Sequence, residues 1–205
     1  MTTATAFAQQ SAKKIGIIFN IDGPYKIYKQ AMYGTGGTDR DVSKDDKFYD
    51  LIQFLGTEKA NPLPRLEEFY INTLKEKGYE VVVLHDTIDA KNFSVFTATK
   101  KKIDFRQFKE KYDVDELMVV KGQYGLELEK VGAFNGDKRT NITFTNFWMD
   151  TNTNVLKKEF YVSKYQNITK KDMLNPPDYP NVTESMDILL NKKVFRSLKS
   201  QLEDY

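Results

Sequence analysis

The sequence predicts an α/β fold of the α+β type, in which helices pack on a mixed sheet in a two- or three-layer sandwich. Two observations predict it. Short β-branched runs such as IGIIFN and EVVVLHD alternate with helical stripes in the first half of the chain. The stretch 111–165 then has the pattern of successive antiparallel strands joined by turns. In chain order the elements are β-α-α-β-α-β-β-β-α, with a long C-terminal helix.

The first strand is expected at Ile15–Asn20, a short and almost continuously apolar run that suits a buried strand. Residues 21–41 mix turn signals with aromatic side chains, so this strand is expected to end at Asn20. Ser43 can cap the helix that follows, which ends at Gly56. Its apolar stripe consists of Phe48, Leu51, Ile52 and Leu55.

A second helix follows the Asn61–Pro64 turn and is closed by Gly78. Its apolar stripe consists of Leu66, Phe69, Tyr70 and Leu74. The run Glu80–Asp86 is a β-branched strand. Asp104 caps a third helix, whose inward-facing residues are Phe105, Phe108 and Tyr112.

The second half of the chain supplies the antiparallel strands and the last helix. A long strand begins at Leu117, and we expect Gly122 and Gly125 to bulge or bend it. Two further strands flank the polar turn Asp150–Asn154. The last helix opens at Thr183, and its apolar residues recur every four positions: Met186, Leu190, Val194, Leu198 and Leu202.

Composition favours one folded domain over residues 13–205. The 205-residue chain is 40% hydrophobic, and its 14 Phe and 12 Tyr supply bulky core side chains. Its 31 basic and 29 acidic residues leave a formal charge of +2, which argues against nucleic acid as a partner. No stretch approaches the roughly 20 apolar residues of a transmembrane helix.

The shortage of metal- and thiol-bearing side chains excludes several kinds of site. The absence of cysteine excludes disulfides, thiol nucleophiles, cysteine zinc sites and a lipid-modified cysteine. A single histidine, His85, excludes a histidine-rich metal site. We therefore predict neither a metal nor a cofactor.

Residues 1–12 are small and uncharged, and Ala6-Phe7-Ala8 fits the small-x-small pattern that precedes a signal-peptidase cut. The segment is predicted to be either the remnant of a signal peptide or a flexible tail. We favour the first, which predicts a periplasmic or secreted bacterial protein. A cytoplasmic location is the open alternative.

The segments KIGIIFN, LKEKGYEVVVLHD and YDVDELMVVKGQYG, followed by the DTNTNVLKKEFY hairpin and a long last helix, resemble a family of extracytoplasmic domains. This is the group of TolB N-terminal domains and CsgG-like, lipoprotein-type domains. The resemblance spans most of residues 13–203. Two features depart from the family: the lipid-attachment cysteine is missing, and Asn154 replaces the usual turn glycine. The resemblance implies a non-catalytic envelope protein that binds a protein or another envelope component, or that self-associates.

The aromatic pair Phe147 and Trp148 interrupts the alternation of its strand. If both cannot face the core, one is exposed and becomes a candidate for binding a partner. The alternative is that Trp148 packs beneath the C-terminal helix.

A second functional class, an α/β enzyme or nucleotide-binding domain, would use the carboxyl ends of the N-terminal strands. A glycine loop could cradle a phosphate through its backbone N–H groups, and His85 beside a carboxylate could be a general base. This class requires the residues to line one cleft. The candidate residues are Asp22, Gly34, Gly36, Gly37, His85 and Asp86.

Overall fold

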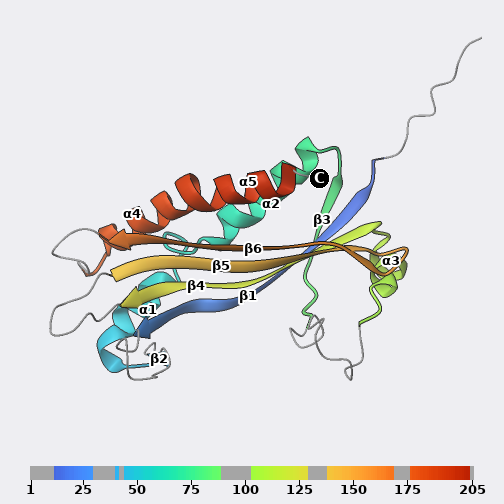
Figure 1. Ribbon diagram of the computed structural model, residues 1–205. Helices are drawn as coiled ribbons and strands as arrows, with labels where there is room; N and C mark the ends of the chain where they lie inside the picture. Colours follow the sequence, from blue (N-terminus) through green and yellow to red (C-terminus); the bar gives the residue numbers. More distant parts are fainter. Residues whose placement is uncertain are drawn as a thin grey trace, which may run out of the picture.

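A computed structural model describes residues 12–29, 40–41, 44–88, 103–128, 138–168 and 176–203. The N-terminal tail predicted at residues 1–12 lies outside the described residues except for Ala12. A mixed sheet forms the centre of the molecule, as predicted (Figure 1). Its strands are β1 (Lys14–Lys29), β2 (Arg40–Asp41), β3 (Glu80–Leu84), β4 (Glu116–Leu128), β5 (Lys138–Asp150) and β6 (Val155–Ile168).

The strand order is β2-β1-β4-β5-β6, and β3 pairs with β1 off this path. The central strand β1 runs parallel to both β3 and β4. The strands β4, β5 and β6 then follow one another antiparallel, as expected for strands that are consecutive in the chain. One edge of the sheet is therefore shared by the short strands β2 and β3, and the other edge is the long strand β6.

Helices cover the two faces unequally. The helix α2 (Leu63–Glu76) and the C-terminal run of α4 (Pro180–Ile188), η3 (Leu189–Val194) and α5 (Phe195–Glu203) lie along one face (Figure 1). The turn η1 (Asp46–Phe48) and the helix α1 (Tyr49–Leu55) belong to the same apolar cluster. On the other face, α3 (Arg106–Tyr112) packs at one end only. The molecule has three layers there and two layers elsewhere.

Two apolar cores follow from this arrangement. The larger core, on the face of α2 and the C-terminal helices, contains Tyr70, Phe144 and Leu190. The smaller core lies under α3 and contains Ile18, Phe108 and Phe147. Successive side chains of a strand point to opposite faces of the sheet. They enter two different apolar cores only at the end where α3 covers the second face.

The strand β1 is longer than the predicted Ile15–Asn20 and reaches Lys29. Its pairing with β4 continues past Asn20, and the register shifts between Asp22 and Lys26, where β1 carries extra residues. The Gly-Pro sequence at positions 23 and 24, a turn signal by itself, thus falls in a bulge of a long strand. Tertiary pairing overrides the local turn preference.

β4 pairs with β5 without a register shift from Glu116 to Leu128, so of the predicted bulge or bend at Gly122 and Gly125, a bulge is absent from this pairing. The irregularity opposite these glycines lies in β1. Gly122 has a different role: a Cβ atom there would lie 2.1 Å from the backbone oxygen of Thr143. A side chain cannot fit at this position unless the two strands separate.

The four-residue spacing of the last helix is accommodated by a change of helix type. The helix begins at Pro180, three residues before the predicted Thr183. In a helix of 3.6 residues per turn, each four-residue step overshoots a full turn by about 40°. The π-helical segment Leu189–Val194 has more residues per turn and offsets this drift. The apolar stripe therefore faces the sheet along its whole length. The residues at its two ends, Val182 and Leu202, are both fully buried. None of the helices that the structure describes is both long and apolar enough to cross a membrane.

Candidate binding surface

The residues of the predicted catalytic or nucleotide site are brought together only in part. His85 is exposed just past the end of β3, and Asp86 is half-buried beside it. The Asp86 carboxylate accepts hydrogen bonds from the Tyr112 hydroxyl (2.7 Å) and from Lys111 Nζ (3.2 Å). The bond from Tyr112, followed by that from Lys111, holds the pKa of Asp86 below its usual range. Asp86 thus joins α3 to β3.

The other members of that site are not described together with His85. Gly34, Gly36 and Gly37 lie outside the described residues, as does the side chain of Asp22. Surface hollows among the described residues include one of about 380 Å³ that contains Asp86 and Lys111 but not His85. Another, of about 300 Å³, lies between α2 and α5 beside Phe69 and Phe195. Within the described part of the chain, no three His, Asp or Glu side chains form a group that could hold a metal ion.

Phe147 and Trp148 are both buried, so the condition under which one of them would be exposed to a partner is not met. Phe147 is 8% exposed and enters the core under α3, whereas Trp148 is fully buried in the larger core. The physical reason is the third layer, because both faces of β5 are covered at this point. Trp148 shares its core with Leu198 and Leu202 of the C-terminal helix, as the alternative reading expected.

Trp148 also belongs to a buried polar network that closes this end of the sheet. Its Nε1–H donates to Glu116 Oε2 (2.6 Å), and Lys157 Nζ lies 2.7 Å from Glu116 Oε1. Lys157 is the extra residue where the pairing of β5 and β6 shifts register. Glu116 is 1% exposed, and the ammonium group of Lys157 balances its charge inside the protein. The polar groups of this network bind one another, so its role is structural.

Away from the end that α3 covers, no described helix lies on the face of β5 and β6 opposite the C-terminal helices (Figure 1). Tyr161 and Tyr165 lie two alternations apart on this face of β6 and are 61% and 53% exposed. Their neighbours Phe160 and Val162 point the other way, into the larger core. We call Tyr161, Ser163 and Tyr165, with Thr143 and Arg139 of β5, the tyrosine face.

Polar contacts hold four side chains of the tyrosine face: Thr143, Ser163, Arg139 and Tyr165. The Thr143 and Ser163 hydroxyls share a hydrogen bond of 3.1 Å. The Arg139 guanidinium lies 4.8 Å from the centre of the Tyr165 ring. It also donates to both carboxylate oxygens of Glu127, at 2.8 and 2.7 Å. The ring of Tyr165 is therefore held in place, as a binding surface requires.

The Glu127–Arg139 pair is the main charged feature of this region. The hydrogen bonds from Arg139 lower the pKa of Glu127, although partial burial opposes the shift. Asn141 Nδ2 adds a longer bond of 3.4 Å to the same carboxylate. Since only 13% of the Glu127 side chain and 20% of the Arg139 side chain are exposed, the pair is largely shielded from water.

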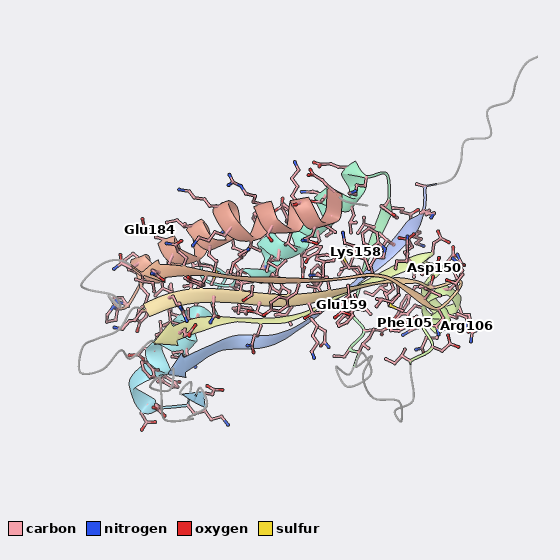
Figure 2. All side chains as sticks on the ribbon, viewed as in Figure 1. Phe105, Arg106, Asp150, Lys158, Glu159 and Glu184 are labelled. Atoms are coloured by element: carbon pink, nitrogen blue, oxygen red, sulfur yellow. The ribbon has the colours of Figure 1, made fainter. Side chains whose placement is uncertain are left out.

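A lysine from the C-terminal helix reaches around the outer edge of β6, which pairs with no described strand. Lys193 of η3 donates to the backbone oxygen of Tyr165 (2.7 Å), and its Nζ lies 5.5 Å from the centre of the Tyr165 ring. The π-helical segment thus touches both the buried and the open side of β6. Figure 2 labels two neighbours on the same strand, Lys158 and Glu159. Lys158 donates to the backbone oxygen of Gln201 in α5, so the alternation places Glu159 on the open side.

The sequence pattern contained the signal for this surface. In Val155–Tyr165 the residues Phe160 and Val162 alternate with Tyr161, Ser163 and Tyr165. The alternation identifies two unlike faces of the strand. It does not say which face the helices leave open.

Comparison with known proteins adds a general likeness of shape. The chain matches no protein-family model and no curated protein. Among solved structures, a Xanthomonas campestris protein assigned to the DUF330 family is similar over 97% of this chain and 88% of its own, at 8% identity and a TM-score of 0.46. A hypothetical protein of Chlamydia trachomatis is similar over 95% of this chain and 98% of its own, at 8% identity and a TM-score of 0.43.

A lipoprotein of Neisseria meningitidis is similar over 86% of this chain and 96% of its own, at 9% identity and a TM-score of 0.36. Likeness at these TM-scores and identities does not define a shared function.

Proposed function

We propose that this chain is a non-catalytic, exported protein of the bacterial envelope that binds another protein through the tyrosine face. The observation that carries the proposal is the exposure of Tyr161 and Tyr165, on either side of Ser163, on a part of the sheet face that no described helix covers. Exposed aromatic residues on a rigid strand are typical anchors of protein interfaces.

The chemistry of the surface favours a protein as the partner. Each tyrosine presents an apolar ring with a polar tip, and the Thr143–Ser163 pair beside them supplies hydroxyl groups. The nearby Arg139 is already paired with Glu127, so its charge is balanced within the protein. A nucleic acid or an anionic membrane surface would instead require a cluster of unpaired cations.

The envelope location rests on the sequence. The small-x-small segment at residues 6–8 and the resemblance to TolB N-terminal and CsgG-like domains support it. Fractionation of cells that express the natural gene tests this part separately. Recovery in the periplasm or medium is expected, and recovery in the cytoplasm would contradict it.

Site-specific photo-crosslinking tests the binding surface. A photoreactive phenylalanine analogue is placed at Tyr161 or Tyr165, and at Tyr49 as a matched control, because Tyr49 is 63% exposed but lies on α1. In cells of the natural host, the first two positions should give the same discrete protein adduct, and position 49 should not. Equal adducts at all three positions, or none at 161 and 165, would refute the proposal.

A further inference from the structure

The second feature of β6 is its outer edge, which no strand in the described part of the chain pairs with. The strand is 14 residues long and pairs with β5 on one side only, and no other described strand lies against it. In an antiparallel pair, alternate residues direct their backbone groups away from the partner. Because Lys193 of η3 binds the backbone oxygen of Tyr165, Tyr165 belongs to the outward set. By alternation, Tyr161 and Ser163 belong to it as well.

This edge is complementary to itself. If a second β6 is laid antiparallel with Ser163 opposite Ser163, then Tyr161 of each copy lies opposite Tyr165 of the other. This creates two aromatic cross-strand pairs on the open face, and such pairs stabilise sheets. The remaining opposed pairs are Lys158 with Ile168, Glu159 with Asn167, Phe160 with Gln166, and Val162 with Lys164. No like charges stand directly opposite each other.

The charges around the edge fit the same arrangement. Lys193 binds the backbone oxygen of Tyr165 in its own copy. In the dimer, Tyr161 of the second copy lies opposite Tyr165, and Glu159 of the second copy is the neighbour of that Tyr161 on the open face. The arrangement therefore brings a lysine of one copy next to a glutamate of the other, twice. For the strands to pair, Lys193 must release the oxygen of Tyr165, and Glu159 offers it a new partner.

We propose that two copies of this chain pair through the free edges of β6, antiparallel and centred on Ser163, and form one continuous sheet. The pairing closes on itself, because an isologous contact uses up the same edge in both copies. The opposite edge is divided between β2, of two residues, and β3, of five residues, and such short strands resist further pairing. A dimer is therefore expected, and a filament is not.

The dimer goes beyond the proposed function, because it is formed by the backbone edge and leaves the tyrosine face open. It joins the two tyrosine faces into one surface. The inference can fail while the tyrosine face still binds another protein, and the reverse also holds. Purified protein alone tests it.

Charge substitutions give the decisive test. The wild-type protein is expected to be a dimer by light scattering and sedimentation. Y161K/Y165K places lysine opposite lysine in both cross-strand pairs, and should raise the dimer dissociation constant by about ten-fold or more. Y161E/Y165K places glutamate opposite lysine in both pairs and should restore the dimer, with an affinity that falls as salt is added. Both positions are exposed, so both variants should fold, which circular dichroism checks.

A crosslink tests the register. Because the chain has no cysteine, S163C introduces a single thiol. Hydrogen-bonded residues across an antiparallel pair have Cα atoms about 5.5 Å apart, within the range of a disulfide. Mild oxidation should convert S163C to a covalent dimer much faster than S200C, whose cysteine would lie exposed on α5. A monomeric wild-type protein, a dimer indifferent to both charge variants, or equal oxidation rates for the two thiols would overturn the proposal.

Discussion

Replacing Trp148 with phenylalanine should destabilise the fold well beyond the loss of a few ring atoms. Trp148 is fully buried, and its Nε1–H donates to Glu116 at 2.6 Å. Phenylalanine has no hydrogen-bond donor, so the bond to Glu116 is lost. The carboxylate keeps Lys157 on its other oxygen but remains buried, at 1% exposure. Water therefore cannot readily supply the missing bond.

The expected magnitude follows from two contributions. A hydrogen bond to a buried charged group contributes about 1.5–3 kcal/mol. The smaller ring leaves a gap in the core beside Tyr79, whose ring centre lies 5.9 Å from that of Trp148. This gap adds about 1 kcal/mol. Together they predict that W148F lowers the free energy of unfolding by about 3 kcal/mol.

Urea denaturation followed by circular dichroism measures this loss. Fluorescence is unsuitable, because Trp148 is the only tryptophan in the chain. Y161F is the matched control, since its ring is 61% exposed, and its free energy of unfolding should change by less than about 0.5 kcal/mol. A loss below about 1 kcal/mol in W148F would refute the role given to the Glu116 network.

Three further predictions concern other parts of the molecule. Gly122→Ala should lower the free energy of unfolding by at least about 2 kcal/mol in urea denaturation, because its Cβ would lie 2.1 Å from a backbone oxygen of β5; a neutral result would contradict the strand packing. Glu127 has a lowered pKa, so its stabilising effect is full above its ordinary pKa of 4.5 and is lost as the pH falls through the lower folded value. The stability difference between wild type and Glu127→Gln should therefore shrink in acid, and a constant difference would exclude the Arg139 pair as its cause. Nucleotides and sugar phosphates should not shift the melting temperature; a clear shift would instead favour the enzyme or nucleotide-binding alternative.

Hydrophobic periodicity and turn residues predicted the order of helices and strands, because those signals are local. The apolar stripe from Leu66 to Leu74 and the helix end at Gly78, which has a φ of 85°, are examples. The length of β1 could not be predicted in this way. Its second half is held by pairing with β4, which lies about a hundred residues further along the chain.

The candidate surface was missed for a related reason. Tyr161 and Tyr165 alternate with core residues in the sequence, but only the position of the C-terminal helices shows which side of β6 is open. The same limit misdirected the interpretation of Phe147 and Trp148. A break in alternation indicates either an exposed residue or a sheet that is covered on both faces. Here the sheet is covered on both faces, because the short helix α3 packs over Phe147.

The binding affinity of the partner identified by crosslinking, measured by calorimetry for wild type and for Y161S/Y165S, tests the central claim most directly. Interface anchors of this kind contribute about 2 kcal/mol or more each, or about 4 kcal/mol for the two, so the double substitution should weaken binding by several hundred-fold, on the order of 700-fold. Its free energy of unfolding should stay within about 1 kcal/mol of wild type, because both side chains are exposed. Unchanged affinity in a folded double variant would contradict the claim that this protein binds its partner through the tyrosine face.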